Sequence, residues 1–224
     1  MIQHPFSLFA PFADRFDVRL FIKEDAVTSD EELRSLLQTT NTASLRQMHT
    51  TTMLTVRAPT ARTKQADGLS TNKNHLWLSV RAADCQMIAA YAPEKHVVGL
   101  LHVGWKNLIQ NAIPLFFAHL SSAWDIDPKQ VYVGIGPSLC VDCSVFTDPV
   151  KELPGIDPRF FHGRRVDLRG IVDGELDAMG IPAAQRQRLP DCTRCKNEQY
   201  WSYRGGDRET VQAGSTNVLA CMLR

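Results

Sequence analysis

The chain has 224 residues, of which 44% are hydrophobic and 22% charged, and its formal net charge is +1. This composition is typical of a globular protein, and the balanced charge gives no basis for attraction to nucleic acid or to a membrane surface. No apolar run approaches the roughly 18 residues of a membrane-spanning helix. The N-terminus lacks the basic segment of an export signal, so we expect a cytoplasmic protein whose six cysteines are free thiols or metal ligands.

The first third of the chain predicts three strands and one helix, joined by polar connectors. The strands are predicted from apolar alternation or β-branched content at residues 16–22, 50–56 and 76–80. Ser29 and Glu32 form a capping box, which predicts a helix over residues 31–38. Polar loops are predicted at residues 39–44 and 59–70.

Residues 82–105 predict an antiparallel hairpin with strands at 86–91 and 97–103. Cys85 precedes the first strand and His102 lies at the end of the second, so the two are expected to meet at one rim of a sheet. A thiol and an imidazole there suit either a nucleophile with its base or two zinc ligands. A buried structural cysteine beside a hydrogen-bonded histidine fits the spacing equally well.

The rest of the chain predicts two helices and two strands. Apolar spacing predicts a helix over residues 108–120, which Pro114 should kink or restart, and another over 168–179 that stops at Gly180. Strands are predicted at residues 131–135 and 217–223. No repeat or linker is evident, so we expect residues 1–224 to form a single domain of mixed α and β structure.

Two C-x-x-C pairs follow the hairpin, Cys140 with Cys143 and Cys192 with Cys195. Their residue types suit a structural zinc ion, but the gap between the pairs far exceeds the roughly 15–20 residues of a zinc ribbon. Neither pair has the βαβ context of a redox motif. We therefore expect Cys192 and Cys195 to be structural thiols that bind no metal.

Three other polar residues have open interpretations. His49 stands next to a predicted strand and by itself is an ordinary surface or hydrogen-bonded histidine. Asp84 fits a turn or capping carboxylate. The alternative is that it supports a neighbouring metal ligand or transfers a proton. Arg204 is a candidate for binding an anion.

Five motifs in this order resemble those of the laccase-domain family, once called multicopper polyphenol oxidases and now regarded as zinc-dependent enzymes of purine nucleosides. The motifs are R-Q-M-H (46–49), A-A-D-C (82–85), H-V-G-W (102–105), I-G-P-S-L-C-V-D-C (135–143) and C-T-R-C-K-N-E-Q-Y-W-S-Y-R (192–204). Lys106 and Asn107 stand where the family has Arg and Gly, and Ser138 stands where it has Cys.

The resemblance implies that His49, Cys85 and His102 are catalytic residues that bind one zinc ion and leave its fourth position open. It implies phosphorolysis of adenosine, inosine, guanosine or methylthioadenosine, and deamination of adenosine, so the substrates would be purine nucleosides and phosphate. The implied fold is α+β, with packed mixed β-sheets flanked by helices, similar to deamidating-toxin catalytic domains. The family usually has T-x-R-x-G-G and S-L-N-L segments before the first motif, and neither is found before His49. This altered N-terminal region leads us to expect weak turnover or a narrowed substrate range.

Two alternatives of other classes remain. One is a Cys85–His102 hydrolase that cleaves an amide, for example in a cell-wall precursor. The other is a metal-binding interaction module without turnover. A true laccase is disfavoured, because several copper ions require more well-placed histidines than this sequence offers.

Overall fold

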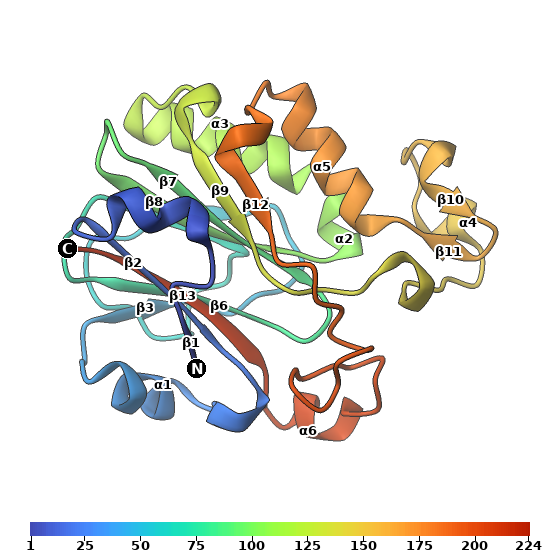
Figure 1. Cartoon of the computed structure of the whole chain (residues 1–224), viewed down its shortest axis with the longest axis horizontal. Coiled ribbons are helices and arrows are strands. Elements are labelled where there is room, and N and C mark those ends of the chain that lie inside the picture. Colours follow the sequence, from blue (N-terminus) through green and yellow to red (C-terminus); the bar gives the residue numbers. More distant parts are fainter.

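The computed structural model describes all 224 residues and contains two mixed β-sheets that pack against each other (Figure 1). The five-stranded sheet has the order β1 (Ile2–Gln3), β2 (Phe16–Phe21), β13 (Asn217–Leu223), β6 (Trp77–Ala82), β3 (Thr42–Ser44). The six-stranded sheet has the order β12 (Arg186–Arg188), β9 (Tyr132–Ile135), β7 (Gln86–Ala92), β8 (Val97–Val103), β5 (Gly68–Thr71), β4 (Met53–Thr55). The pairs β3–β6, β4–β5 and β9–β12 are parallel, and the other pairs are antiparallel.

Helices cover the outer faces of both sheets (Figure 1). The longer ones are α1 (Asp30–Leu37), α3 (Ala112–Trp124) and α5 (Leu168–Ala178); the shorter ones are α2 (Trp105–Leu108), α4 (Pro149–Glu152) and α6 (Arg208–Gln212). A small hairpin is formed by β10 (Phe161–His162) and β11 (Arg165–Val166). None of these helices is long and apolar enough to cross a membrane.

The six-stranded sheet is covered on both faces, and β7 shows how. Met87, Ala89 and Tyr91 belong to a core of 24 residues shared with the five-stranded sheet. Ile88 and Ala90 point the other way, into a core of 22 residues shared with α3 and α5. Because successive side chains of a strand alternate between faces, a doubly covered strand must be apolar throughout. The continuous apolar runs of the predicted hairpin have this cause.

The predicted fold class is confirmed, as are most of the long elements. The predicted capping box lies at the N-terminus of α1. The Glu32 N–H donates to the Ser29 hydroxyl at 3.2 Å, and the Ser29 N–H donates to the Glu32 carboxylate at 3.0 Å. The expected interruption near Pro114 is a restart, since α2 ends at Leu108 and Pro114 lies in the first turn of α3. Proline is tolerated there because the first N–H groups of a helix have no intrahelical partner.

Two segments that were predicted as loops contain short strands in the structure. β3 falls in the predicted loop 39–44, and β5 begins within the predicted connector 59–70. β12, with the sequence Arg-Gln-Arg, was not predicted either. These strands have three or four residues and gain their conformation from pairing with a long neighbour, which a local pattern does not record.

Candidate metal centre

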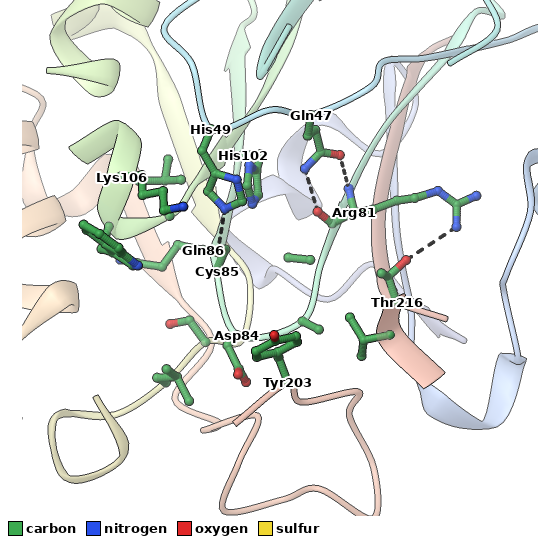
Figure 2. Close-up of a pocket in the computed structure, with 18 of the residues that line it drawn as sticks. Gln47, His49, Arg81, Asp84, Cys85, Gln86, His102, Lys106, Tyr203 and Thr216 are labelled. Carbon is green, nitrogen blue, oxygen red and sulfur yellow. Dashed lines mark hydrogen bonds between the residues drawn. The ribbon is translucent and has the colours of Figure 1, made fainter. Parts of the chain in front are cut away.

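The structure brings His49, Cys85 and His102 together at the rim of the six-stranded sheet (Figure 2). Cys85 lies in the loop between β6 and β7, and the β7–β8 register pairs Met87 with His102. His49 comes from the loop that precedes β4. The potential ligand atoms all lie within 4.8 Å of one another, and the Cys85 sulfur is 3.7 Å from His49 Nε2. Two imidazoles and one thiolate at these separations can share a single metal ion.

A fully buried carboxylate, Asp67, bonds to the imidazole of His102 and to the backbone around His49. It accepts a hydrogen bond from His102 Nδ1 at 2.9 Å, which leaves Nε2 of that ring for a metal. It also accepts the backbone N–H groups of Met48, His49 and Thr50 at 2.7–3.1 Å. These bonds offset the cost of the left-handed backbone at His49, whose φ is 58°. Sequence reasoning missed Asp67, because Asp-Gly in a polar stretch indicates only a turn.

The three groups Cys85, His102 and Asp67 shift one another's pKa values. Burial raises the pKa of the Cys85 thiol, but the charge and hydrogen bond of His102, with a hydrogen bond from His49, lower it to about 6. Burial lowers the pKa of His102, yet the Cys85 thiolate and Asp67 raise it to about 9. Burial likewise raises the pKa of Asp67, and bonds from His102 and the 48–50 loop lower it to about 2. Without a metal, the site at neutral pH is therefore a thiolate beside an imidazolium.

Gly104 and Asn107 shape the turn that follows His102. A Cβ at Gly104 would lie 2.6 Å from His49 Cδ2 and 2.9 Å from the Cys85 sulfur, so only glycine leaves room for this cluster. The buried Asn107 carboxamide accepts from the Gly104 N–H at 2.6 Å and donates to the His102 carbonyl at 2.7 Å. Asn107, where the family has Gly, thus stabilises the turn beside the cluster.

The carboxylate of Asp84, next to Cys85, bonds to segments that are distant in the sequence and does not cap its own turn. It accepts from the hydroxyls of Thr193 and Ser202 at 2.8 and 2.6 Å and from the Arg204 N–H at 2.7 Å. These bonds hold a residue whose φ is 91°. The Arg204 guanidinium lies 5.0 Å from the centre of the Phe146 ring and donates to a backbone carbonyl, so it is already engaged.

A cavity of about 750 Å³ opens above the cluster and includes all three potential ligands in its wall. Trp105 and Tyr203 contribute aromatic side chains. The cationic residues in the wall are Arg62, Arg81, Lys106 and Arg204. Arg81 forms an ion pair with Asp30. The Lys106 ammonium lies 5.6 Å from the centre of the Trp105 ring, and neither Lys106 nor Arg62 has an acidic partner. Lys106 and Arg62 are therefore the cations available to an anionic ligand.

We expected Cys192 and Cys195 to bind no metal because a long stretch of sequence separates them from the first C-x-x-C pair, but the structure brings the two pairs together. The sulfur atoms of Cys140, Cys143, Cys192 and Cys195 also lie within 4.8 Å of one another. The long gap between the pairs is spanned by α5 and by β12, which returns the chain parallel to β9 and so brings the second pair beside the first.

Fold and site together define an α+β protein of packed mixed sheets with a His–Cys–His cluster at the foot of a cavity. A profile of the family described as "Multi-copper polyphenol oxidoreductase laccase" matches residues 17–222, and the chain belongs to this family.

Several curated relatives carry enzyme names. The chain is 27% identical to purine nucleoside phosphorylase YlmD of Bacillus subtilis over 62% of this chain and 47% of that protein. It is 29% identical to the YlmD enzyme of Geobacillus stearothermophilus, over 65% of this chain and 56% of that protein. It is 25% identical to adenosine deaminase RL5 of an unknown prokaryotic organism, over 67% and 60%. The chain thus spans about half the length of the curated relatives it matches.

Solved structures share the fold. The structure of YlmD from Geobacillus stearothermophilus aligns with a TM-score of 0.75 at 22% identity, covering 96% of this chain and 93% of that one. Bacillus licheniformis hypothetical protein YfiH aligns with a TM-score of 0.73 at 22% identity, covering 86% and 79%.

Proposed function

We propose that this protein is a zinc-dependent enzyme of purine nucleosides, which cleaves them with phosphate and deaminates adenosine at the same site. The observation that carries the proposal is the convergence of His49, Cys85 and His102 on one point of the cavity wall. The names of the relatives, phosphorylase and deaminase, supply the two reactions.

The donor set fits zinc. Two imidazoles and a thiolate are common zinc ligands, and the Asp67–His102 bond is the carboxylate–histidine arrangement that orients such ligands. When bound, a zinc ion with three protein ligands supplies a Lewis acid at its open fourth position. The low pKa of Cys85 favours the thiolate form that a metal requires.

The other residues of the cavity would bind and orient the substrates. In phosphorolysis a phosphate oxygen bonds to ribose C1′ while the bond from C1′ to the purine nitrogen breaks and its electron pair leaves with the base. Lys106 and Arg62, free of acidic partners, would hold the phosphate anion near the metal centre. Trp105 and Tyr203 would offer faces for the purine ring.

The experiment incubates the zinc-loaded protein with adenosine, inosine and methylthioadenosine, with and without phosphate, and follows free base and inosine by chromatography. We expect free base only with phosphate, and inosine from adenosine without it. Cys85→Ala should abolish both products. Cys221→Ala, at a buried cysteine of β13 outside the cavity, is the matched control and should retain them. Equal product from Cys85→Ala would contradict the proposal.

One observation favours a second candidate, an amide hydrolase. Cys85, His102 and Asp67 form a thiolate, an imidazolium and a carboxylate in sequence, which is the arrangement of a cysteine hydrolase. A thiolate committed to zinc is a poor free nucleophile, so metal separates the candidates. Hydrolysis of an amide substrate by metal-free protein, together with no turnover of nucleosides by the zinc form, would favour the hydrolase.

A further inference from the structure

The four cysteines of the two C-x-x-C pairs form a second cluster, separate from the His–Cys–His cluster. All are free thiols. The Cys143 and Cys195 sulfurs are 3.5 Å apart, and those of Cys140 and Cys195 are 3.9 Å apart. A disulfide needs about 2 Å, whereas tetrahedral zinc with Zn–S bonds of about 2.3 Å places its sulfurs roughly 3.8 Å apart. The observed separations are those of ligands that share a metal.

Each pair lies in a tight turn that points both sulfurs to one side. The Cys143 N–H donates to the Cys140 carbonyl at 3.1 Å, and the Lys196 N–H donates to the Cys192 carbonyl at 2.9 Å. The Cys140 N–H donates to the Cys192 sulfur at 3.3 Å, which ties one turn to the other. Amide donors to sulfur stabilise the thiolate and orient it, as groups around metal ligands do.

Further contacts that hold the two turns together involve no sulfur atom. Ser138 and Cys192 form a parallel β-bridge through their backbones, which continues the parallel pairing of β9 with β12. Arg169, on α5, donates to the carbonyls of Leu139 at 3.0 Å, Pro190 at 2.9 Å and Asp191 at 2.7 Å. One guanidinium thus clamps the backbone just before each cysteine pair, so the four thiols are brought together by the fold itself.

We infer that these four cysteines bind a structural zinc ion, separate from the His–Cys–His centre. A closed set of four thiolates leaves no position for substrate, so the ion has a structural role. Cys143 and Cys192 are buried, while Cys195 is exposed and gives the metal a path from solvent.

The second site also supports the first one. Thr193, between two of the proposed ligands, donates to the Asp84 carboxylate at 2.8 Å. The Leu139 N–H, next to Cys140, donates to the Asp84 carbonyl at 3.3 Å. Asp84 precedes Cys85 directly, so the two turns hold the loop that carries the thiol of the His–Cys–His centre. Loss of the structural ion is therefore expected to loosen Cys85 as well.

Metal analysis of the full-length purified protein tests the inference. We expect two equivalents of zinc in the native protein and one in Cys85→Ala. In that variant, X-ray absorption should show sulfur alone around zinc, at about 2.3 Å. Cys192→Ser with Cys195→Ser should lose one equivalent, whereas Cys221→Ser should keep both. The measurement on Cys85→Ala stands even if the double variant does not fold.

Three results would overturn the inference: no metal in Cys85→Ala, nitrogen or oxygen ligands around its zinc, or disulfides among the four cysteines in peptide maps. Iron in place of zinc would overturn the identity of the metal. The inference does not rest on the proposed function, because a native protein without nucleoside turnover would still hold the sulfur-bound zinc.

Discussion

Asp67 accepts the Nδ1–H of His102 at 2.9 Å, and through its bonds to the 48–50 loop it also fixes the backbone of His49. One buried carboxylate therefore orients the His102 ring and fixes the backbone that carries His49, two of the three ligands of the proposed zinc centre. Neither imidazole is positioned by its own strand or loop alone.

Replacing this carboxylate should weaken metal binding more than it alters the fold. In Asp67→Asn the amide group meets several N–H donors with less acceptor capacity, so we expect zinc affinity to fall about 10- to 100-fold. Stability should also fall, by about 1.5–3 kcal/mol. Competition with a chelator measures the first effect and thermal unfolding the second.

The matched control is Asp17→Asn, since Asp17 is buried on β2 and pairs with Arg19 and Arg224 outside the cavity. It should lower stability and leave zinc affinity unchanged. Unchanged affinity in Asp67→Asn would show that the carboxylate does not support the ligand.

Gly104→Ala should displace the cluster. The added Cβ would meet His49 and the Cys85 sulfur below 3.0 Å, so one of these ligands must move. We expect the loss of one of the two zinc equivalents, the one at the His–Cys–His centre, and the loss of turnover. Gly136→Ala is the control, because a Cβ there meets nothing closer than 3.6 Å. The zinc content of the two purified variants is the measurement, and two equivalents of zinc in Gly104→Ala would argue against ligation by His49 and Cys85 together.

The reactivity of Cys85 in metal-free protein should follow its lowered pKa. The thiolate forms above about pH 6, against about 9 for an unperturbed thiol, so alkylation by iodoacetamide should reach half its maximal rate near pH 6. His102→Ala removes the main stabilising charge and should move this midpoint upward. Mass spectrometry of the peptide that contains Cys85 follows the reaction selectively. Zinc should protect the residue, and alkylation at the same rate with zinc bound would contradict metal ligation.

Lys106 should contribute to phosphate binding. Its effect on phosphate can be separated from other effects because only one of the two proposed reactions uses phosphate. Lys106→Ala should raise KM for phosphate in phosphorolysis about 10- to 100-fold, the equivalent of one charge-assisted hydrogen bond. Deamination consumes water and should change little. Lys106→Arg restores the charge and should recover most of the affinity, while the exposed Lys151→Ala is a neutral control. Equal losses in both reactions would point to a structural role for Lys106.

The sequence alone determined those features that depend on a local residue pattern or on two strands adjacent in the chain. Ser29 and Glu32 predict the start of α1 because a capping box satisfies its own N–H groups within four residues. The β7–β8 hairpin follows from two apolar runs joined by a turn, and its antiparallel pairing puts Cys85 near His102. The five motifs identify the family, which the match to residues 17–222 confirms.

Only the tertiary structure decided the partners that come from distant segments. Asp67 reaches His102 because β5 pairs with β8, although the short strand that follows Asp67 has no strand pattern of its own. Cys192 reaches Cys140 because β12 runs parallel to β9 and Arg169 clamps both chain segments. Ligand spacing along the sequence predicts a metal site only when one local unit supplies all the ligands. Here the sheet register sets the distances, and register arises from packing of the whole chain.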